Sequence, residues 1–355
     1  MIGGQWDISW HRAIGRDTFW TPAHIAIYMC GVLAGISCGY LILATTLNRG
    51  SALANASVQV LGFRGPLGAF IAAWGGVAML TSAPFDNWWH DAYGLDVKIV
   101  SPPHILLILG VLAVNVGTLT LILSQMNRAT DRLKKQFDFL FVYLGAMIVA
   151  LISVFLMEFS SITLLHTSLP YRTAAIVIPV TLAGIWRASG QKYAATLMTA
   201  IFTLLMLALI WILPLFPAEP KLGPVYQRVT TFVPPPFPSL FIVPAFFLDL
   251  LWQRTRKWNL WLLALVSGAV FVGFYLAAEW PFGNFLNSAA SNNWFFGTGI
   301  LDYATPPNSY LARHMFYMPE SAAVFSLWIG ISVIFATLST RLGFTWGEWM
   351  KKIQR

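Results

Sequence analysis

The sequence is poor in charged residues. Asp, Glu, Lys and Arg make up only 10% of its 355 residues, whereas 57% are hydrophobic. A soluble globular domain carries about 25% charged residues. The deficit argues against an ordinary soluble domain and favours a protein with lipid around much of its surface. The 16 tryptophans and 26 phenylalanines fit this class, because aromatic side chains anchor membrane proteins at the bilayer interfaces.

Cysteine is also scarce, with only Cys30 and Cys38, both inside one apolar run. This excludes a disulfide framework and a thiolate metal site. Residues 1–20 lack the apolar core of a secretory signal, so we expect that they are not a cleaved leader. The net charge of +8 is typical of basic loops beside a membrane, and no nucleic-acid partner is expected.

Long apolar runs are the main feature that is present. A helix needs about 20 mostly apolar residues to cross the hydrocarbon layer. Candidate spans fall at 22–46, 65–85, 102–125, 137–158, 171–187, 193–214, 238–252, 258–278 and 319–340. The runs are continuous, whereas the strands of a membrane barrel alternate polar and apolar residues. The sequence therefore predicts an all-α, polytopic integral membrane protein with about nine transmembrane helices.

The basic residues indicate an orientation. Most of the 22 fall in the segments after the odd-numbered spans: Arg49, Arg64, Arg128, Arg132, Lys134, Lys135, Arg187, Lys192, Arg254, Arg256, Lys257, Arg341, Lys351, Lys352 and Arg355. Cytoplasmic loops carry an excess of Lys and Arg. We therefore expect the N-terminus outside and the C-terminus in the cytoplasm, with the chain in the inner membrane of a bacterium.

The histidines and most acids fall on the opposite, outer face. All six histidines are assigned there: His11, His24, His90, His104, His166 and His314. So are ten of the fourteen acids: Asp7, Asp17, Asp86, Asp91, Asp96, Glu158, Glu219, Glu279, Asp302 and Glu320. Ionisable groups in or near a bilayer are costly and indicate function. The outer face is therefore the predicted location of the site.

The first candidate metal site is Asp7, His11 and His24, with the spacing D-x3-H-x12-H. Residues four apart share one face of a helix, so Asp7 and His11 would point the same way. Gly15 would end this short helix. Pro22 would start the first span, which places His24 in its opening turn. A bound metal would join the surface helix to the spanning helix.

The second candidate site repeats the design with Asp86, His90 and His104, spaced D-x3-H-x13-H. A carboxylate and a histidine again lie four apart, and Pro103 precedes the histidine that opens a span. Each set has its own paired carboxylate and its own histidine at a span entrance. We therefore predict two separate metal sites on one face.

Two imidazoles and one carboxylate suit Cu(II), Fe(II) or Zn(II), and three protein ligands leave positions open for water, oxygen or substrate. The ligand types do not choose among these metals, so copper, zinc and iron stay open, with one or two ions per chain. A lone histidine at a membrane interface is usually a hydrogen-bonded polar residue. Two sets with the same carboxylate and histidine spacing favour metal binding.

The segment WHRAIGRDTFWTPAH, with Asp7 ahead of it, resembles the C subunit of the particulate methane and ammonia monooxygenases. That subunit has the pattern D-x3-H-x12-H with an Arg-Asp-Thr run. The second set is similar to the subunit's second copper position, Asn-x3-His-x13-His, with Asp86 in place of asparagine. The resemblance covers roughly residues 1–125.

The last third is similar, more weakly, to the A subunit of the same enzymes. The likeness rests on FPSLFIVPAFFLD at 237–249, EWPFGNF from Glu279, and Thr305 with Pro306. We therefore expect three regions of three spans each: a C-like metal-binding region at 1–125, an unassigned middle at 126–225 and an A-like region at 226–355.

The resemblance implies a copper-dependent membrane monooxygenase, or a subunit of one, that oxidises a small apolar substrate with O2. Asp7, His11 and His24 would hold the catalytic metal. Asp86, His90 and His104 would hold a second metal, for electron supply or as an alternative catalytic centre. No haem, flavin or iron–sulfur motif is present, so electrons would come from a quinol or a redox partner, in a homo- or hetero-oligomer. The alternatives are a non-enzymatic copper-handling or delivery protein and a structural subunit of a larger membrane complex.

Overall fold

The computed structural model describes all residues except 49, 51–53, 55–56, 95–100, 256 and 355. Three basic residues used to predict the orientation, Arg49, Arg256 and Arg355, and one acid assigned to the outer face, Asp96, therefore lie outside the described residues. The chain forms two compact units. The N-terminal unit comprises Ile2–Asp7, Arg16–Leu144 and Lys351–Arg355, and the C-terminal unit comprises Met1, Ile8–Gly15 and Gly145–Met350. The three sequence regions remain a prediction.

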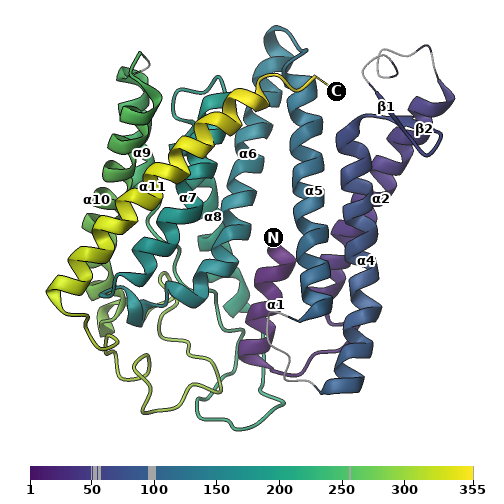
Figure 1. Cartoon of the computed structure of the whole chain (residues 1–355). Helices are drawn as coiled ribbons and strands as arrows, with labels where there is room; N and C mark the ends of the chain where they lie inside the picture. The colour runs from purple at the N-terminus through teal and green to yellow at the C-terminus, as the bar shows by residue number, and fades with distance from the viewer. Residues whose placement is uncertain (49, 51–53, 55–56, 95–100, 256, 355) are drawn as a thin grey trace. The chain divides into compact units, whose positions relative to one another are not determined.

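The N-terminal unit is built on three long helices that run side by side (Figure 1). They are α2 (Pro22–Leu47), α4 (Leu67–Tyr93) and α5 (Pro102–Met126), accompanied by the first part of α1 (Ile2–Ala13) and of α6 (Asp131–Leu156). Proline at the first helical position starts α2 and α5, because its fixed φ suits a helix and its missing N–H is not needed there. A small hairpin, β1 (Val58–Val60) and β2 (Phe63–Gly65), precedes α4.

Glycines let these helices approach closely. A Cβ on Gly75 of α4 would lie 2.7 Å from the carbonyl oxygen of Gly110 in α5, and one on Gly76 would lie 2.6 Å from that of Gly31 in α2. Neither backbone can move away easily, so only glycine fits. Small residues at such crossings give membrane helices their close van der Waals packing. This packing aligns the start of α2, the end of α4 and the start of α5 at one end of the unit, where His24, Asp86, His90 and His104 lie.

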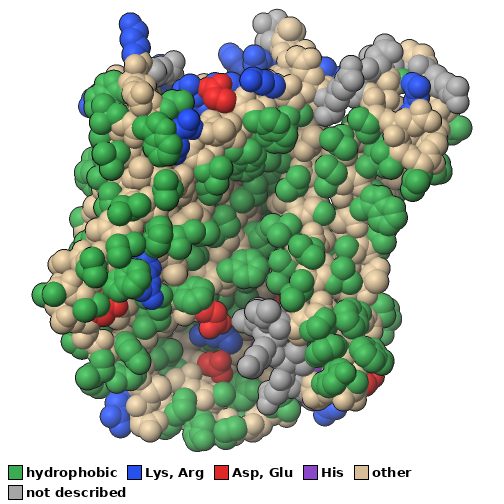
Figure 2. All heavy atoms as spheres, in the orientation of Figure 1, with side chains coloured by type: hydrophobic (Ala, Val, Ile, Leu, Met, Phe, Trp, Pro, Cys, Tyr) green, Lys and Arg blue, Asp and Glu red, His purple; other side chains and the backbone are tan. Residues whose placement is uncertain are grey.

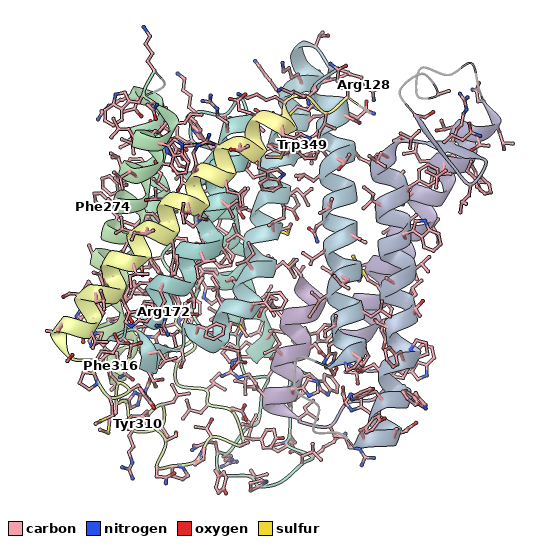
Figure 3. All side chains as sticks on the ribbon, viewed as in Figure 1. Arg128, Arg172, Phe274, Tyr310, Phe316 and Trp349 are labelled. Carbon is pink, nitrogen blue, oxygen red and sulfur yellow. The ribbon has the colours of Figure 1, made fainter. Side chains whose placement is uncertain are left out.

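The C-terminal unit contains the rest of α6 together with five helices, α7 (Leu169–Ala188), α8 (Ala194–Ile212), α9 (Ile242–Arg254), α10 (Leu260–Leu286) and α11 (Ala322–Met350). Helix α11 packs against both α7 and α10. Arg172 lies over the ring of Trp328 with 4.5 Å from its guanidinium carbon to the ring centroid, which ties α7 to α11 (Figure 3). Long loops before α9 and after α10 gather at one end of this unit (Figure 1).

Among the described residues, eight helices are long and apolar enough to cross a membrane. They are Pro22–Leu47, Leu67–Tyr93, Pro102–Met126, Arg132–Phe159, Leu169–Ala188, Ala194–Leu215, Leu260–Leu286 and Ala322–Met350. Figure 2 shows hydrophobic side chains over the visible flanks of the helices. The chain is therefore an all-α polytopic protein with the properties of an integral membrane protein, as the sequence predicted.

The predicted seventh span, 238–252, is not a full-length helix. Its helical part is α9, with 13 residues, and the chain before it is extended and largely buried. Pro234, Pro235, Pro236 and Pro238 explain the difference, because proline has no N–H to donate and clashes with the preceding turn of a helix. The carboxylate of Glu279 in α10, which is 3% exposed, accepts the N–H of Leu240 at 2.9 Å and so satisfies a half-buried donor ahead of α9.

The second part of α1, which begins at Ile8, belongs to the C-terminal unit and is held by loops of that unit. Ser9 donates to the carbonyl of Val233, and Arg12 donates to the carbonyl of Pro234 at 2.9 Å. The Arg12 guanidinium also lies 3.9 Å from the carboxylate of Asp302. Burial lowers the pKa of Arg12 and raises the pKa of Asp302, and their mutual attraction opposes both shifts. These contacts fix the helical turn that carries His11.

Candidate metal centres

The turn before α2 orients His24. Thr21 precedes the helix with φ −55° and ψ 135°, and its hydroxyl oxygen accepts the N–H of Thr18 at 2.8 Å. The N–H of Thr21 in turn donates to the carbonyl of Thr18 at 3.0 Å. This closed turn holds the Thr18 carbonyl beside the first turn of α2, where it lies 3.0 Å from Nδ1 of His24.

The other nitrogen of His24 faces two carboxylates. Nε2 lies 3.1 Å from Oδ1 of Asp7 and 3.4 Å from Oδ2 of Asp17. A carbonyl oxygen can only accept a hydrogen bond, so Nδ1 of His24 carries the proton that it shares with Thr18. In the neutral ring, Nε2 then carries a lone pair that points at the carboxylates of Asp7 and Asp17. Three acceptors at these distances require a cation among them, either a proton on Nε2 or a metal ion.

The first predicted set comes together. Asp7 and His11 occupy successive turns of the continuous helix α1, and one ligand atom from each of Asp7, His11 and His24 lies within 4.8 Å of the other two. Donors bound to one ion at about 2.0–2.2 Å are about 3.4 Å apart in a tetrahedral site. The three residues therefore need only a small contraction to share an ion. His11 is exposed, and the other two are partly buried.

Asp17 is a site residue that the ligand prediction missed. It lies in the turn between α1 and α2, so its spacing of seven residues from His24 does not place the two side chains on one helix face. Its side chain is only 10% exposed, less than that of Asp7 at 23%. The signal that could have identified it is its place in the Arg-Asp-Thr run directly before the turn that orients His24.

The C-terminal end of α4 orients His90 in the same manner. Nδ1 of His90 lies 3.3 Å from the carbonyl oxygen of Gly94, so this nitrogen carries the proton, and Nε2 lies 3.4 Å from Oδ2 of Asp86. Gly94 has φ +94° and ψ 171°, a backbone conformation almost restricted to glycine. The glycine that ends α4 thus also turns its carbonyl towards the histidine.

His104 is positioned by the start of α5. Ser101 precedes Pro102 and Pro103, and its hydroxyl oxygen accepts the N–H of His104. Nε2 of His104 lies 3.5 Å from Oδ1 of Asp86. One carboxylate of α4 therefore faces two imidazoles, one from its own helix and one from α5.

The second set has unsatisfied polar atoms that fit a cation site. Oδ1 of Asp86 and Nδ1 of His104 are buried and have no hydrogen-bond partner within the described part of the chain. Buried polar atoms without partners are costly, and a metal ion between Asp86 and the imidazoles would relieve the carboxylate. Within the described residues, only the first set forms a group of three with every ligand atom within 4.8 Å of the others.

Asp7, Asp17 and His24 of the first set and all three residues of the second set belong to the N-terminal unit. Tyr28 lies one turn after His24, with 6.1 Å between the ring centroids. The carboxylates of Asp7, Asp17 and Asp86 all act electrostatically on the hydroxyl of this tyrosine. One phenol is therefore within range of the acids of both centres.

The two remaining histidines make other contacts. The ring of His166 is stacked between Trp280 and Phe316, with ring centroids 4.2 Å and 3.7 Å away, and its Nε2 lies 3.2 Å from the carbonyl oxygen of Trp280. His314 has a positive φ of 53°, and its Nε2 lies 3.5 Å from the amide nitrogen of Asn292. Both belong to the C-terminal unit and neither joins the described metal group.

The fold and these contacts define a class, the polytopic helical membrane proteins with a histidine and carboxylate centre at one end of the helices. Comparisons of the chain with family models, with curated proteins and with solved structures found no match. The likeness to the copper membrane monooxygenases therefore rests on the residues and spacings of the sequence alone.

Proposed function

We propose that the protein is a copper-binding membrane protein, and that it acts as a copper-dependent monooxygenase, or a subunit of one, on a small apolar substrate with O2. The proposal combines the geometry of the two candidate centres with the resemblance of residues 1–125 to the C subunit of the particulate methane and ammonia monooxygenases. The geometry supports a metal site, and the resemblance supports copper.

The observation that carries the proposal is the shared orientation of His24 and His90. In both, Nδ1 is committed to a backbone carbonyl and Nε2 faces a carboxylate. Histidines that bind metal usually donate their other N–H to a carbonyl or carboxylate, which fixes the tautomer and the ring orientation. Two unrelated turns achieve this arrangement at one end of the same unit.

Asp7, His11 and His24 would hold the metal of the first centre, and Asp86, His90 and His104 that of the second. Bound copper would supply one-electron chemistry and the activation of oxygen. The carbonyls of Thr18 and Gly94 fix the protons of His24 and His90 on Nδ1 and so leave Nε2 of each ring facing a carboxylate. Electrons would reach the centres from a quinol in the bilayer or from a redox partner in a larger oligomer.

We propose that the chain lies in the inner membrane of a bacterium, with both centres near the outer face, the N-terminus outside and the C-terminus in the cytoplasm. The excess of basic residues in the predicted cytoplasmic segments supports this orientation. A small apolar substrate would then enter from the lipid, and oxygen would enter from either phase.

Copper handling without catalysis is the second candidate. The exposure of His11 favours it, because an exposed ligand can pass a metal ion to another protein more readily than a buried one. Zinc or iron would serve equally well as a bridge between helices if the site were structural. The discriminating property is turnover, because only the oxygenase consumes oxygen in step with the oxidation of a substrate.

The test uses the full chain purified from its native membranes. Metal analysis should find one or two copper ions per chain, and a quinol should support oxygen consumption when a short alkane or ammonia is added. Copper without oxygen consumption would support the handling role. Stoichiometric zinc without copper would contradict both copper proposals, and no transition metal would contradict the metal site itself.

A further inference from the structure

We propose that Asp17 is a second carboxylate of the first centre, so that this centre carries one more negative charge than the second and holds divalent metal more strongly. The inference rests on the proposed metal binding and adds a ligand that fixes how the two centres differ. It concerns Asp7, Asp17 and His24, which all belong to the N-terminal unit.

The geometry of Asp17 matches that of the predicted ligand Asp7. Both carboxylates approach the same atom, Nε2 of His24, at 3.4 Å and 3.1 Å. Asp17 reaches it from the turn before α2, whereas Asp7 reaches it from α1. Two carboxylates from separate segments that converge on one imidazole nitrogen are mutually repulsive. Their convergence is stabilised when a cation lies between them.

The turn that carries Asp17 is already fixed by its own hydrogen bonds. Thr18, the next residue, exchanges two hydrogen bonds with Thr21 and accepts the proton on Nδ1 of His24. The same turn therefore orients the imidazole and delivers the carboxylate. Asp17 is also the less exposed of the two acids at this nitrogen. The hydrogen bonds between Thr18 and Thr21 therefore hold the Asp17 carboxylate beside His24.

The second centre lacks this additional acid in the contacts described. Asp86 is the carboxylate that both of its histidines face, through Oδ2 to His90 and Oδ1 to His104. Asp91 lies one residue beyond His90, but it is exposed and accepts a hydrogen bond from Asn87 at 3.4 Å. Among the described residues, which leave out 95–100 beside the second centre, the first centre therefore has two carboxylates near its imidazoles and the second has one.

This difference sets the charge of each centre when metal is bound. Two ionised carboxylates and two neutral imidazoles make a divalent ion neutral overall and leave a monovalent ion with one negative charge. One carboxylate makes a monovalent ion neutral and leaves a divalent ion with one positive charge. Near a low-dielectric bilayer, a neutral assembly is favoured over a charged one. The first centre thus prefers Cu(II), and the second centre accepts an electron more readily.

The experiment compares the wild type with Asp17→Asn in the full-length protein in detergent. The probe is Cu(II) alone, with a competing chelator to measure retention and a stepwise reduction followed by EPR. Asp17→Asn should weaken Cu(II) binding at the first centre by about tenfold or more, in the range for loss of a group that supports a metal site. The Cu(II) of the first centre should also be reduced to Cu(I) at a higher potential than in the wild type. The reduction potential of the second centre should stay unchanged.

Two further variants keep the result interpretable. Glu219→Gln removes one negative charge from an exposed acid assigned to the same face, and it should change neither centre. Asp17→Glu keeps the charge and should recover most of the affinity. Equal Cu(II) retention and equal reduction potential in Asp17→Asn and wild type would overturn the inference while the metal site stands. A wild-type protein that binds no Cu(II) would overturn the metal site and the inference together.

Discussion

His90 and Gly94 hold each other through two contacts at the end of α4. The N–H of Gly94 donates to the carbonyl of His90 at 2.9 Å, and Nδ1 of His90 lies 3.3 Å from the carbonyl oxygen of Gly94. The positive φ of Gly94 makes the second contact possible. The residue that ends the helix therefore also decides which nitrogen of His90 is free to face Asp86.

Replacing Gly94 with alanine should damage the second centre selectively. An alanine at φ +94° and ψ 171° is strained by about 1–3 kcal/mol, and relaxation would turn the carbonyl away from His90. Metal analysis of Gly94→Ala should show loss of the second ion with the first retained. Gly62→Ala, at a positive φ in the exposed hairpin, is the matched control for strain alone. Equal metal loss in both variants would mean that strain, and not the His90 contact, is responsible.

Removing a histidine of the first set should remove one ion. His24→Ala leaves Asp7 and Asp17 without the imidazole that they face, and His11→Ala leaves the group with two members. We expect each variant to lose roughly one metal ion per chain, with little loss of fold, because most helix packing lies elsewhere. The control is His314→Ala, because His314 is not part of either set. This variant should keep the full metal content of the wild type. Unchanged metal content in both His11→Ala and His24→Ala would refute this site.

Glu279 should stabilise the C-terminal unit through the backbone of Leu240. Glu279→Ala leaves the half-buried N–H of Leu240 without this acceptor and should cost about 1 kcal/mol of unfolding free energy. Glu279→Gln keeps a side-chain carbonyl oxygen and should cost less. Thermal unfolding in detergent measures both. A larger loss of thermal stability in Glu279→Gln than in Glu279→Ala would show that Glu279 acts through its charge and not through this hydrogen bond.

The orientation can be tested with reporters at the two ends. A reporter fused after the C-terminus should be active in the cytoplasm, and one at the N-terminus should be accessible from outside. This outcome requires an odd number of crossings. The eight long helices must therefore be joined by a ninth crossing, formed by the extended chain before α9 together with α9 itself. Both reporters on one side would mean an even number and would contradict the proposed orientation.

The helices could be predicted from the sequence because their signal is local. An apolar run of about 20 residues indicates a spanning helix whatever its neighbours are. The seventh span was less predictable, since its apolar residues continue through a segment in which Pro234 to Pro238 prevent a helix. Whether such a segment is stable depends on a distant acceptor, Glu279, and the sequence does not pair that residue with Leu240.

The candidate site was predictable where its residues are linked by helical spacing or by a helix start. Asp7 with His11, and Asp86 with His90, follow from an interval of four, and His24 and His104 follow from the prolines before them. Asp17 follows from neither rule, because the conformation of a turn decides where its side chain points. The same is true of the Thr18 and Gly94 carbonyls, which fix the histidine protons through backbone geometry alone.

The central claim is that two metal ions bind separately, one at each candidate set, and metal density in a map of the copper-loaded protein tests it most directly. The account predicts two peaks. One should lie among Asp7, His24 and their neighbours His11 and Asp17, and the other among Asp86, His90 and His104. A single ion coordinated by both His24 and His104, or no density at either set, would contradict it.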